Sequence, residues 1–320
     1  MILITGAAGF IGYHVSDRFL SNKRKVIGID NLNSYYDVKL KKLRIKNLKK
    51  KYNKSFKFIK TDIRNKKQLK NIFKKYKIKT IIHLAAQAGV RYSIFNPKVY
   101  FDTNVIGFYN IINFANIYSI KHLVFASSSS VYGDQAKYPI HEYFNTDKPL
   151  SFYAGTKKAN EALGYSFSKI YKLPMTCMRL FTVYGPYGRP DMAPYKFTES
   201  AINKKVIKVY NKGNHERDFT FIDDVAHSIF KLSKKVPYNN LYQTFNICSG
   251  KKTKLSTFIK IIEKNLKVKI KKKYISRQKG DVIKTYGSNK KLIKEIKFKK
   301  FTSIESGMKK FIEWFLKNNV

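Results

Sequence analysis

The chain has 320 residues, of which 43% are hydrophobic and 15% are aromatic, a composition that excludes an intrinsically disordered protein. The length suits one large α/β unit or two domains, and no apolar run is long enough to span a membrane. The first residues lack the basic lead of a signal peptide, and the two cysteines indicate buried thiols rather than a disulfide framework, so we expect a cytoplasmic protein without a membrane partner.

The charge is unusual, with 65 Lys and Arg residues against 20 Asp and Glu residues and a net charge of +45. Such a charge is typical of proteins that bind polyanions. The excess is mostly lysine and runs along the whole chain, which fits the codon usage of an AT-rich genome. Proteins that read bases favour arginine, because its planar fork binds them bidentately. We therefore expect no nucleic-acid partner, although a positive field would attract an anionic substrate.

The chain begins with a pattern typical of a dinucleotide-binding unit. An apolar strand is predicted over Ile2–Thr5, followed by the turn Gly6-Ala-Ala-Gly9-Phe-Ile-Gly12 and an amphipathic helix to about Asn22. The next strand ends in Asp30, about 20 residues past the glycines. The glycines would let a pyrophosphate approach the backbone and the free N–H groups at the helix start. Asp30 would bind the ribose hydroxyls and repel a 2′-phosphate, which favours NAD over NADP.

The alternation of strands and helices then continues and predicts a Rossmann-type, doubly wound parallel sheet. Further strands are predicted over 56–62, 80–86, 122–126 and 174–181, and helices over 67–77, 100–118 and 153–171. A basic, helical stretch from about Tyr35 to Lys54 is either a membrane-surface helix or, as we expect, a solvated helix with one face on the protein body.

The second half shows no further glycine fingerprint and predicts a smaller domain. A loop rich in Gly and Pro leaves the strand at Thr182, and Arg217 lies in a turn. Helices are expected over 197–203 and 255–266 and at the end of the chain, with strands over 207–210, 219–222 and near Tyr274. We therefore predict an NAD-binding Rossmann domain over 1–178, with a returning segment near 218–236, and a substrate-binding α/β domain over 179–320.

The stretch from Ala126 to Lys157 carries a candidate acid/base site. Four serines, 127–130, follow a strand, and Tyr153 and Lys157 are four residues apart, so they share one face of a helix. A tyrosine titrates at a pH of about 10, so it acts as a base near neutrality only when a neighbouring cation favours the phenolate. A lone Tyr-x-x-x-Lys pair is commonly a surface feature, but this one follows a nucleotide unit and a serine-bearing strand end.

Together these motifs resemble the extended short-chain dehydrogenase/reductase family over nearly the whole chain. The resemblance rests on the segments 5–12, 83–91, 104–107, 126–133, 153–157, 179–192 and 217–224. Within the family, the serine run and the segment Gly188-Arg-Pro-Asp-Met192 are similar to the UDP-glucuronate 4-epimerases of bacteria and plants.

The resemblance implies hydride chemistry on a nucleotide sugar, with NAD as cofactor and no metal. Tyr153 would take the proton of the sugar 4-hydroxyl, Lys157 would support the phenolate and hold the nicotinamide ribose, and Ser128 would bond to the reacting oxygen. The hydride of C4 would return to the opposite face of a 4-keto sugar. The implied cofactor-binding residues are Gly6, Gly9, Phe10, Ile11, Gly12, Asp30, Asn31, Asp62, Ile63, Leu84, Ala85, Ala86, Gln87, Asn104, Tyr153 and Lys157.

The expected substrate is a UDP-sugar with a carboxylate. A 4-keto uronate is a β-keto acid that loses CO2 readily, so an epimerase must hold the carboxylate with several donors. Ser129, Ser130 and Thr182 are candidates. Family dehydratases and decarboxylases place an acid after the first residues of the serine run, and this chain has only serine there. Arg217 and Arg277 would bind the diphosphate, and the further substrate candidates are Arg91, Arg189 and Asp281.

Several alternatives stay open at this point. The enzyme could be a 4-epimerase of UDP-N-acetylglucosamine or its uronic acid, or a dehydratase or decarboxylase of the same fold. A nucleotide-sensing scaffold and a polyanion-binding protein are alternatives from other classes. We also expect a homodimer through a four-helix bundle, formed by small residues of the helix over 153–171 and by Phe108, Ile111, Ile112 and Ala115.

Overall fold

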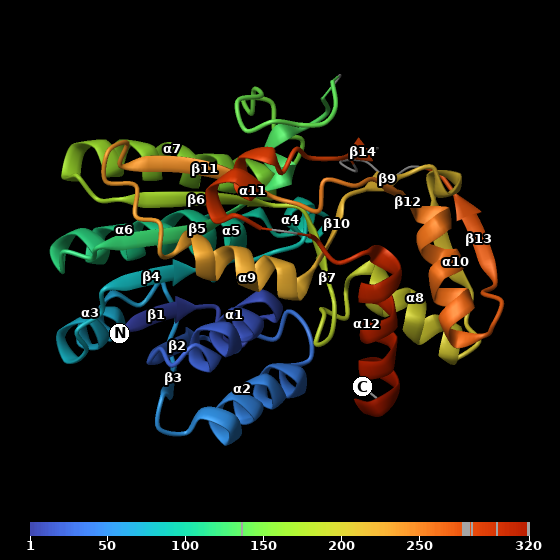
Figure 1. Ribbon diagram of the computed structural model, residues 1–320, viewed down its shortest axis with the longest axis horizontal. Helices are drawn as coiled ribbons and strands as arrows, with labels where there is room; N and C mark the ends of the chain where they lie inside the picture. Colours follow the sequence, from blue (N-terminus) through green and yellow to red (C-terminus); the bar gives the residue numbers. More distant parts are fainter. Residues whose placement is uncertain (136, 277–281, 283, 299, 319–320) are drawn as a thin grey trace. The chain divides into compact units, whose positions relative to one another are not determined.

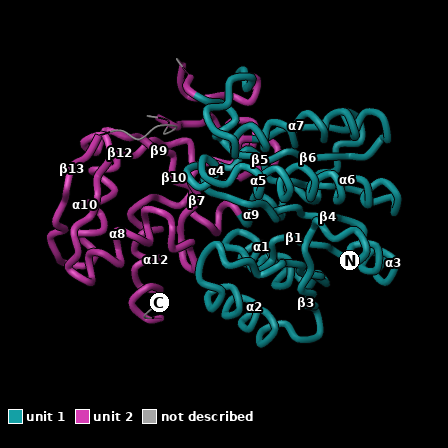
Figure 2. Tube along the Cα trace, turned by 180° about the vertical axis from the view of Figure 1, so that it is seen from behind, with its two compact units in different colours: residues 1–133, 144–180, 226–245 teal, residues 134–143, 181–225, 246–320 magenta. Residues whose placement is uncertain are grey.

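The computed structural model (Figure 1) describes residues 1–135, 137–276, 282, 284–298 and 300–318. The chain forms two compact units, which Figure 2 shows in different colours. Unit 1 consists of residues 1–133, 144–180 and 226–245, and unit 2 consists of residues 134–143, 181–225 and 246–320. Two elements, α9 (Ile222–Leu232) and β11 (Tyr242–Ile247), contain a point where the chain passes from one unit to the other.

A seven-stranded parallel sheet forms the centre of unit 1, in the order β11-β6-β5-β4-β1-β2-β3. The strands are β1 (Ile2–Thr5), β2 (Val26–Asp30), β3 (Phe56–Lys60), β4 (Thr80–His83), β5 (His122–Ser128) and β6 (Met175–Leu180). β1 pairs with β2 on one side and with β4 on the other, so the strand order reverses at β1. This arrangement confirms the predicted doubly wound fold and places a topological switch point beside the glycine turn.

Helices cover the sheet. Successive residues of a strand point to opposite faces, and the strands are largely apolar runs, so both faces of the sheet are apolar. The helices of unit 1 include α1 (Phe10–Ser21), α2 (Val38–Tyr52), α3 (Lys66–Lys75), α6 (Gly107–Ile117) and α7 (Phe152–Tyr171). α6 lies beside both α3 and α7 (Figure 1). α1 contacts α2, and its Phe19 packs edge-on against Phe230 of α9, with 5.1 Å between ring centroids.

The basic stretch after β2 folds as α2, with one face on the body of unit 1. Leu40, Ile45 and Leu48 are buried on that face, together with two cations, Lys41 and Arg44. α2 contacts α1 and β3. The apolar side of α2 is thus covered by protein rather than free to lie on a membrane. Within the described ranges, no helix combines the length and apolar character needed to cross a bilayer.

The single helix predicted over 100–118 is wrong in detail. The chain forms two short helices, α4 (Tyr92–Phe95) and α5 (Pro97–Tyr100), then a π-helical turn over Phe101–Ile106, and only then α6. π-turns are rare and occur often at functional sites. Here the turn carries Asn104, which is buried.

The dimer residues expected on α6 are also wrong. Phe108, Ile111, Ile112 and Ala115 are fully buried and belong to the core cluster that α3 and α6 form with the sheet. The prediction failed because apolar residues occur on more than one side of this helix. On the other side, the exposed apolar side chains include Tyr109 and Ile117 of α6 and Ile106 at the end of the preceding π-turn.

Unit 2 is a smaller α/β assembly of short strands and helices. β7 (Thr182–Tyr184) pairs with β10 (Phe219–Phe221), β8 (Ile207–Tyr210) pairs with β13 (Lys272–Ile275), and β9 (Glu216–Arg217) lies between β12 (Thr253–Lys254) and β14 (Lys284–Thr285). Its helices are α8 (Ala193–Ile202), α10 (Leu255–Leu266), α11 (Lys290–Ile296) and α12 (Ile304–Asn318). α10 contacts α8 and α12, and Phe258 of α10 stacks on Phe219, with 4.5 Å between ring centroids.

Three segments of unit 2 differ from the sequence-based expectation. Thr182 and Arg217, expected in an irregular loop and a turn, lie in the short strands β7 and β9. The helix expected over 197–203 begins at Ala193 instead. Pro194 occupies its first turn, where the missing N–H group costs nothing because that group has no partner within the helix.

Candidate functional site

The glycine turn after β1 brings backbone segments so close together that only glycine fits at two positions. Gly6 has a φ of +71°, and a side chain there would meet the backbone of Ala85 at 2.8 Å. A Cβ on Gly12 would lie 2.0 Å from the carbonyl oxygen of Gly6. α1 starts at Phe10, and its N-cap residue, Gly9, makes no side-chain capping bond. The N–H groups in the first turn of an α-helix have no partner within the helix, so the start of α1, behind a turn of small residues, fits the pyrophosphate of a dinucleotide.

Acidic side chains follow at the ends of β2 and β3. Asp30 accepts hydrogen bonds from the N–H groups of Leu32 (2.8 Å) and Ala8 (3.2 Å), and burial raises its pKa. Although burial alone would raise the pKa of Asp62, hydrogen bonds from Arg64 and Asn31 lower it to about 2. Asp30 is thus tied to the glycine turn, while Asp62 is already bonded to the side chains of Asn31 and Arg64.

The end of β4 is fixed by a buried polar network. Thr5 Oγ1 accepts hydrogen bonds from the N–H groups of Leu84 (3.1 Å) and Ala85 (3.0 Å) and lies 2.8 Å from His83 Nδ1. Burial lowers the pKa of His83 to about 3, so this imidazole is neutral. Asn104 Oδ1 accepts from the Gln87 N–H group (2.8 Å). Residues 84–87 therefore form a rigid backbone edge at the switch point.

The other implied cofactor residues lie near the glycine turn and the ends of β3 and β4, but the side chains of some of them are buried. Phe10 is buried, Ile11 is half-buried, and Ala86 follows Ala85 on the β4 edge. The side chain of Ile63 is buried in the core of unit 1. Its carbonyl oxygen accepts a hydrogen bond from Asn110 Nδ2 (3.0 Å). Ile63 could thus contribute only through its backbone.

Lys157 connects the helix that carries Tyr153 to the strand that carries Ser128. Lys157 is buried, and its Nζ donates a hydrogen bond to the carbonyl oxygen of Ala126 (2.9 Å), two residues before Ser128 on β5. Burial lowers the pKa of Lys157 to about 8. Tyr153 lies one turn earlier on α7; its N–H group donates to Ser93 Oγ (3.2 Å). α7 thus places Lys157 against β5, with Tyr153 one turn earlier on the same helix.

The serine run continues beyond the strand. Ser127 and Ser128 are the last residues of β5, while Ser129 and Ser130 begin a 3₁₀ turn over Ser129–Tyr132. Ser128 Oγ accepts a hydrogen bond from the Ser130 N–H group (3.2 Å), which caps the turn. Ser129 and Ser130 are half-buried, so their hydroxyls are not sealed in the core.

The substrate candidates are distributed over both units. Arg91 is exposed at the start of α4 in unit 1. In unit 2, Thr182 is half-buried, Arg189 pairs with Asp191 (Nε–Oδ1, 2.9 Å), and Arg217 Nη2 donates to the carbonyl oxygen of Val282 (2.6 Å). A diphosphate at either of these arginines would compete with an existing partner. Two further candidates, Arg277 and Asp281, lie outside the described residues.

Sequence reasoning missed two buried acidic groups close to these residues. Glu161, one turn after Lys157, forms a buried ion pair with Arg179 of β6. Asp218, next to Arg217, accepts hydrogen bonds from the Ser249 N–H group (2.8 Å) and Oγ (2.7 Å). The four-residue spacing from Lys157 to Glu161 was visible in the sequence. The partners of Asp218 come from distant segments and gave no such signal.

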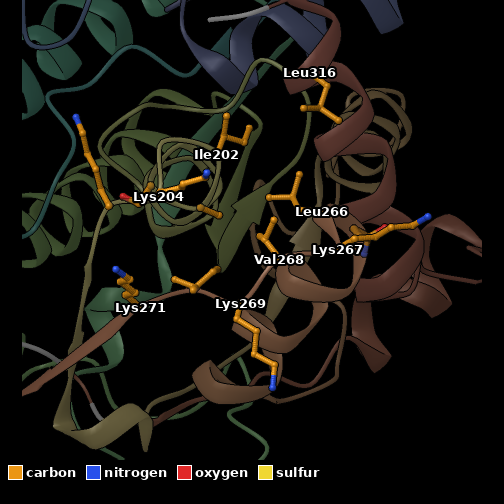
Figure 3. A pocket seen from close by; sticks show the side chains of 13 residues that line it. Ile202, Lys204, Leu266, Lys267, Val268, Lys269, Lys271 and Leu316 are labelled. Atoms are coloured by element: carbon orange, nitrogen blue, oxygen red, sulfur yellow. The ribbon is translucent and has the colours of Figure 1, made fainter.

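A pocket of about 590 Å3 in unit 2 is lined by none of the candidate residues (Figure 3). Ile202, Leu266, Val268 and Leu316 surround it, and the side chain of Lys269 extends away from these apolar residues. The pocket is therefore not assigned to the candidate site. The described residues also contain no cluster of three or more His, Cys, Asp or Glu side chains that could hold a metal ion.

Comparisons with known proteins match nearly the whole chain. A family model described as GDP-mannose 4,6 dehydratase matches residues 3–311. Protein CapI of Staphylococcus aureus is 42% identical, with 98% of both chains covered. UDP-glucuronate 4-epimerase of Thermodesulfobacterium geofontis is 41% identical, covering 99% of this chain and 96% of that protein.

A solved structure also matches the chain end to end. The crystal structure of UDP-glucuronic acid 4-epimerase from Bacillus cereus, in complex with UDP-glucuronic acid and NAD, has a TM-score of 0.91 with this chain. The two sequences are 28% identical, and 99% of each chain is covered.

Proposed function

Because this chain belongs to the extended short-chain dehydrogenase/reductase family, we propose that it is an NAD-dependent 4-epimerase that converts UDP-glucuronate to UDP-galacturonate. One observation carries the proposal. Lys157 is buried beside the serine run and lies one helical turn from Tyr153. The run itself, residues 127–130, contains no acidic residue. The names of full-length relatives, including the one from Thermodesulfobacterium geofontis, support the same substrate.

The acid/base step is assigned to Tyr153. With a pKa of about 8, Lys157 is mostly an ammonium at neutral pH, and its charge favours the phenolate of Tyr153. The phenolate takes the proton of the sugar 4-hydroxyl, and Ser128 donates a hydrogen bond to the same oxygen. When bound, NAD supplies the hydride chemistry at C4 of the sugar. After the 4-keto sugar rotates so that its opposite face can receive the hydride, Tyr153 returns its proton to the oxygen at C4.

Unit 1 is proposed to hold the cofactor. The glycine turn and the start of α1 bind the pyrophosphate, and Asp30 binds the adenosine ribose. The carboxylate of Asp30 accepts hydrogen bonds from the N–H groups of Ala8 and Leu32, so it lies beside the glycine turn. Its negative charge would repel a 2′-phosphate, and we therefore assign NAD rather than NADP.

Retention of the sugar carboxylate distinguishes epimerisation from decarboxylation. The bond to CO2 breaks only when it is aligned with the π system of the 4-keto group. We propose that the hydroxyls of Ser129 and Ser130 hold the carboxylate out of this alignment, together with Thr182. Arg217 and Arg277 are assigned to the diphosphate. The further assignments to the substrate are Arg91, Arg189 and Asp281.

We also propose a homodimer, with a different face from the one expected on the sequence. Exposed apolar side chains lie on the outer side of α6, at the last residue of the π-turn before it, and on the outer side of α7: Tyr109 and Ile117, Ile106, and Leu163 and Ile170. α6 and α7 lie side by side (Figure 1), so these residues form one apolar face. A second copy of the same face would bury it in a four-helix arrangement.

The decisive experiment is to incubate the purified protein with UDP-glucuronate and to separate the sugar nucleotides by chromatography, with CO2 measured in parallel. UDP-galacturonate without CO2 is the expected product. The variant Tyr153→Phe, which keeps the ring but lacks the hydroxyl, should lose at least about 100-fold in kcat. UDP-xylose or a 4-keto pentose with CO2 would instead show a decarboxylase. If a parallel incubation converts UDP-N-acetylglucosamine and UDP-glucuronate stays unchanged, the substrate is UDP-N-acetylglucosamine.

A further inference from the structure

Behind the proposed catalytic residues lies a buried ion pair between Glu161 of α7 and Arg179 of β6. Arg179 Nε donates to Glu161 Oε1 (2.9 Å), and Arg179 Nη2 donates to Glu161 Oε2 (2.7 Å). Both side chains are only 8% exposed. This two-bond geometry fixes the guanidinium and the carboxylate relative to each other. A buried pair of this kind contributes little net stability, which raises the question of what else it does.

Each partner of the pair bonds to one end of the serine-bearing segment. Ser127 Oγ donates to Glu161 Oε1 (2.5 Å), and Ser127 is the residue before Ser128. Arg179 Nη1 donates to Tyr132 Oη (2.9 Å), and the guanidinium also lies over the Tyr132 ring, 4.7 Å from its centroid. Tyr132 ends the 3₁₀ turn that carries the other two serines. The ion pair therefore holds both ends of the segment over 127–132.

The pair also lies next to Lys157. Glu161 follows Lys157 by one helical turn and Tyr153 by two, so the three share a face of α7. Burial lowers the pKa of Lys157, and Cys177 and then the carboxylate of Glu161 act in the opposite direction. Cys177 could do so only as a thiolate, and burial raises its own pKa well above the usual value, so Glu161 is the anion that opposes burial.

The other titratable groups that face Lys157 are uncharged. His83 of β4 is neutral, and burial raises the pKa values of Cys177 on β6 and Tyr242 on β11 well above their usual values. Apart from Tyr153 itself, the charges within the described surroundings of Lys157 are therefore those of Glu161 and Arg179.

We infer that Glu161 and Arg179 are positioning residues for the reaction proposed above: they hold the segment over 127–132 in place, and Glu161 supplies a buried negative charge one helical turn from Lys157. This inference rests on the proposed function. Neither residue touches the substrate, so both act through the serines and Lys157.

The test combines a charge variant with two variants that keep the charge. In Glu161→Gln, Lys157 loses its buried counter-charge, so the fall of kcat at high pH should move to lower pH by about one unit. In Ser127→Ala and Arg179→Lys the charges remain while a bond to the segment is lost. Both should lower kcat three- to tenfold with KM within twofold and with the position of the alkaline fall unmoved. Asp224→Asn removes a carboxylate of unit 2 that is bonded to Thr302. It is the matched control and should leave the pH of the alkaline fall in kcat unchanged.

A second measurement does not need a substrate. In protein labelled with 15N-lysine, the Nζ signal of Lys157, assigned by its loss in Lys157→Arg, should titrate about one pH unit lower in Glu161→Gln than in the unaltered protein. An unmoved titration overturns the inference, as do wild-type kcat values in Ser127→Ala and Arg179→Lys. If Glu161→Gln does not fold, these two variants decide. Absence of epimerase activity in the unaltered protein would refute the proposed function, not the Lys157 titration.

Discussion

Arg44 donates a hydrogen bond from Nη1 to the carbonyl oxygen of Ala8 (2.9 Å), in the middle of the glycine turn. The same nitrogen donates to Tyr36 Oη (2.7 Å), and the residue is fully buried. α2 thus places a permanent cation directly behind the turn. A buried cation at this position both fixes the turn and favours a polyanionic ligand in front of it.

The first prediction concerns this contact. Arg44→Met should lower the free energy of unfolding by about 2 to 4 kcal/mol, because the Ala8 carbonyl and the Tyr36 hydroxyl lose a buried charged donor. It should also reduce the NAD retained by the purified protein severalfold, measured by enzymatic cycling after gel filtration. Lys46→Met, on the exposed side of α2, is the control and should change neither quantity. Equal NAD retention in the two variants would contradict a role of Arg44 in cofactor binding.

A second prediction contrasts two glycines. A Cβ on Gly12 would lie 2.0 Å from the Gly6 carbonyl oxygen, whereas a Cβ on Gly155 would have no neighbour within 4 Å. Gly12→Ala should therefore separate α1 from the turn and cost more than about 3 kcal/mol of unfolding free energy. Gly155→Ala, inside α7, should change it by at most about 1 kcal/mol, in the stabilising direction. Denaturant unfolding of both variants checks this, and similar losses in both would show that the close approach of α1 is unimportant.

A third prediction concerns the pH dependence of stability. Burial raises the pKa of Asp218 to about 6, against hydrogen bonds from Ser249 and Gly250 that lower it. The folded protein thus holds this proton at a higher pH than the unfolded chain, in which an aspartate titrates at about 4. Protonated Asp218 therefore favours the folded state at low pH, and this contribution is lost as the pH rises from about 4 through about 6.

Asp218→Asn removes this titration. The free energy of unfolding of the unaltered protein, minus that of the variant, should be about 1 kcal/mol larger at pH 5 than at pH 7. Urea unfolding at the two pH values measures it. Asp134→Asn, which removes an exposed carboxylate of unit 2, should show no such change between the two pH values. A difference that instead grows with pH would mean that Asp218 is stabilised as the anion.

The proposed dimer gives a fourth prediction. Leu163→Glu and Ile117→Glu each place a charge on the apolar face of α6 and α7, so both should shift sedimentation from dimer to monomer at micromolar concentration. Val206 of unit 2 is also exposed, at 55%, and Val206→Glu should leave the dimer intact. The proposal fails if the unaltered protein sediments only as a monomer.

The sequence allowed the sheet to be predicted and the main site residues to be proposed, because both depend on local patterns. The glycine turn is contiguous with β1 and α1, and the pair Tyr153 and Lys157 occupies a single helix. Which side of a helix is buried was harder to predict. In α6, the buried Phe108 and the exposed Tyr109 are neighbours and both aromatic, so composition did not reveal the inner side.

The parts that could not be predicted depend on contacts between distant residues. Arg44 reaches back 36 positions to Ala8, and Arg179 meets Glu161 from the next strand. β9 and β14 contain two residues each, too few for any periodicity to appear in the sequence. Such elements exist because partners on other segments supply their hydrogen bonds.

The way the chain alternates between its units limits how the protein can be altered. The segment over 134–143 belongs to unit 2 although the segments before and after it belong to unit 1. α9 and β11 each begin in one unit and end in the other. A single recombination between two related genes therefore cannot exchange either unit whole, and no truncation isolates one. New substrate preferences in such a chain have to arise by substitutions in place, rather than by transfer of a ready-made module.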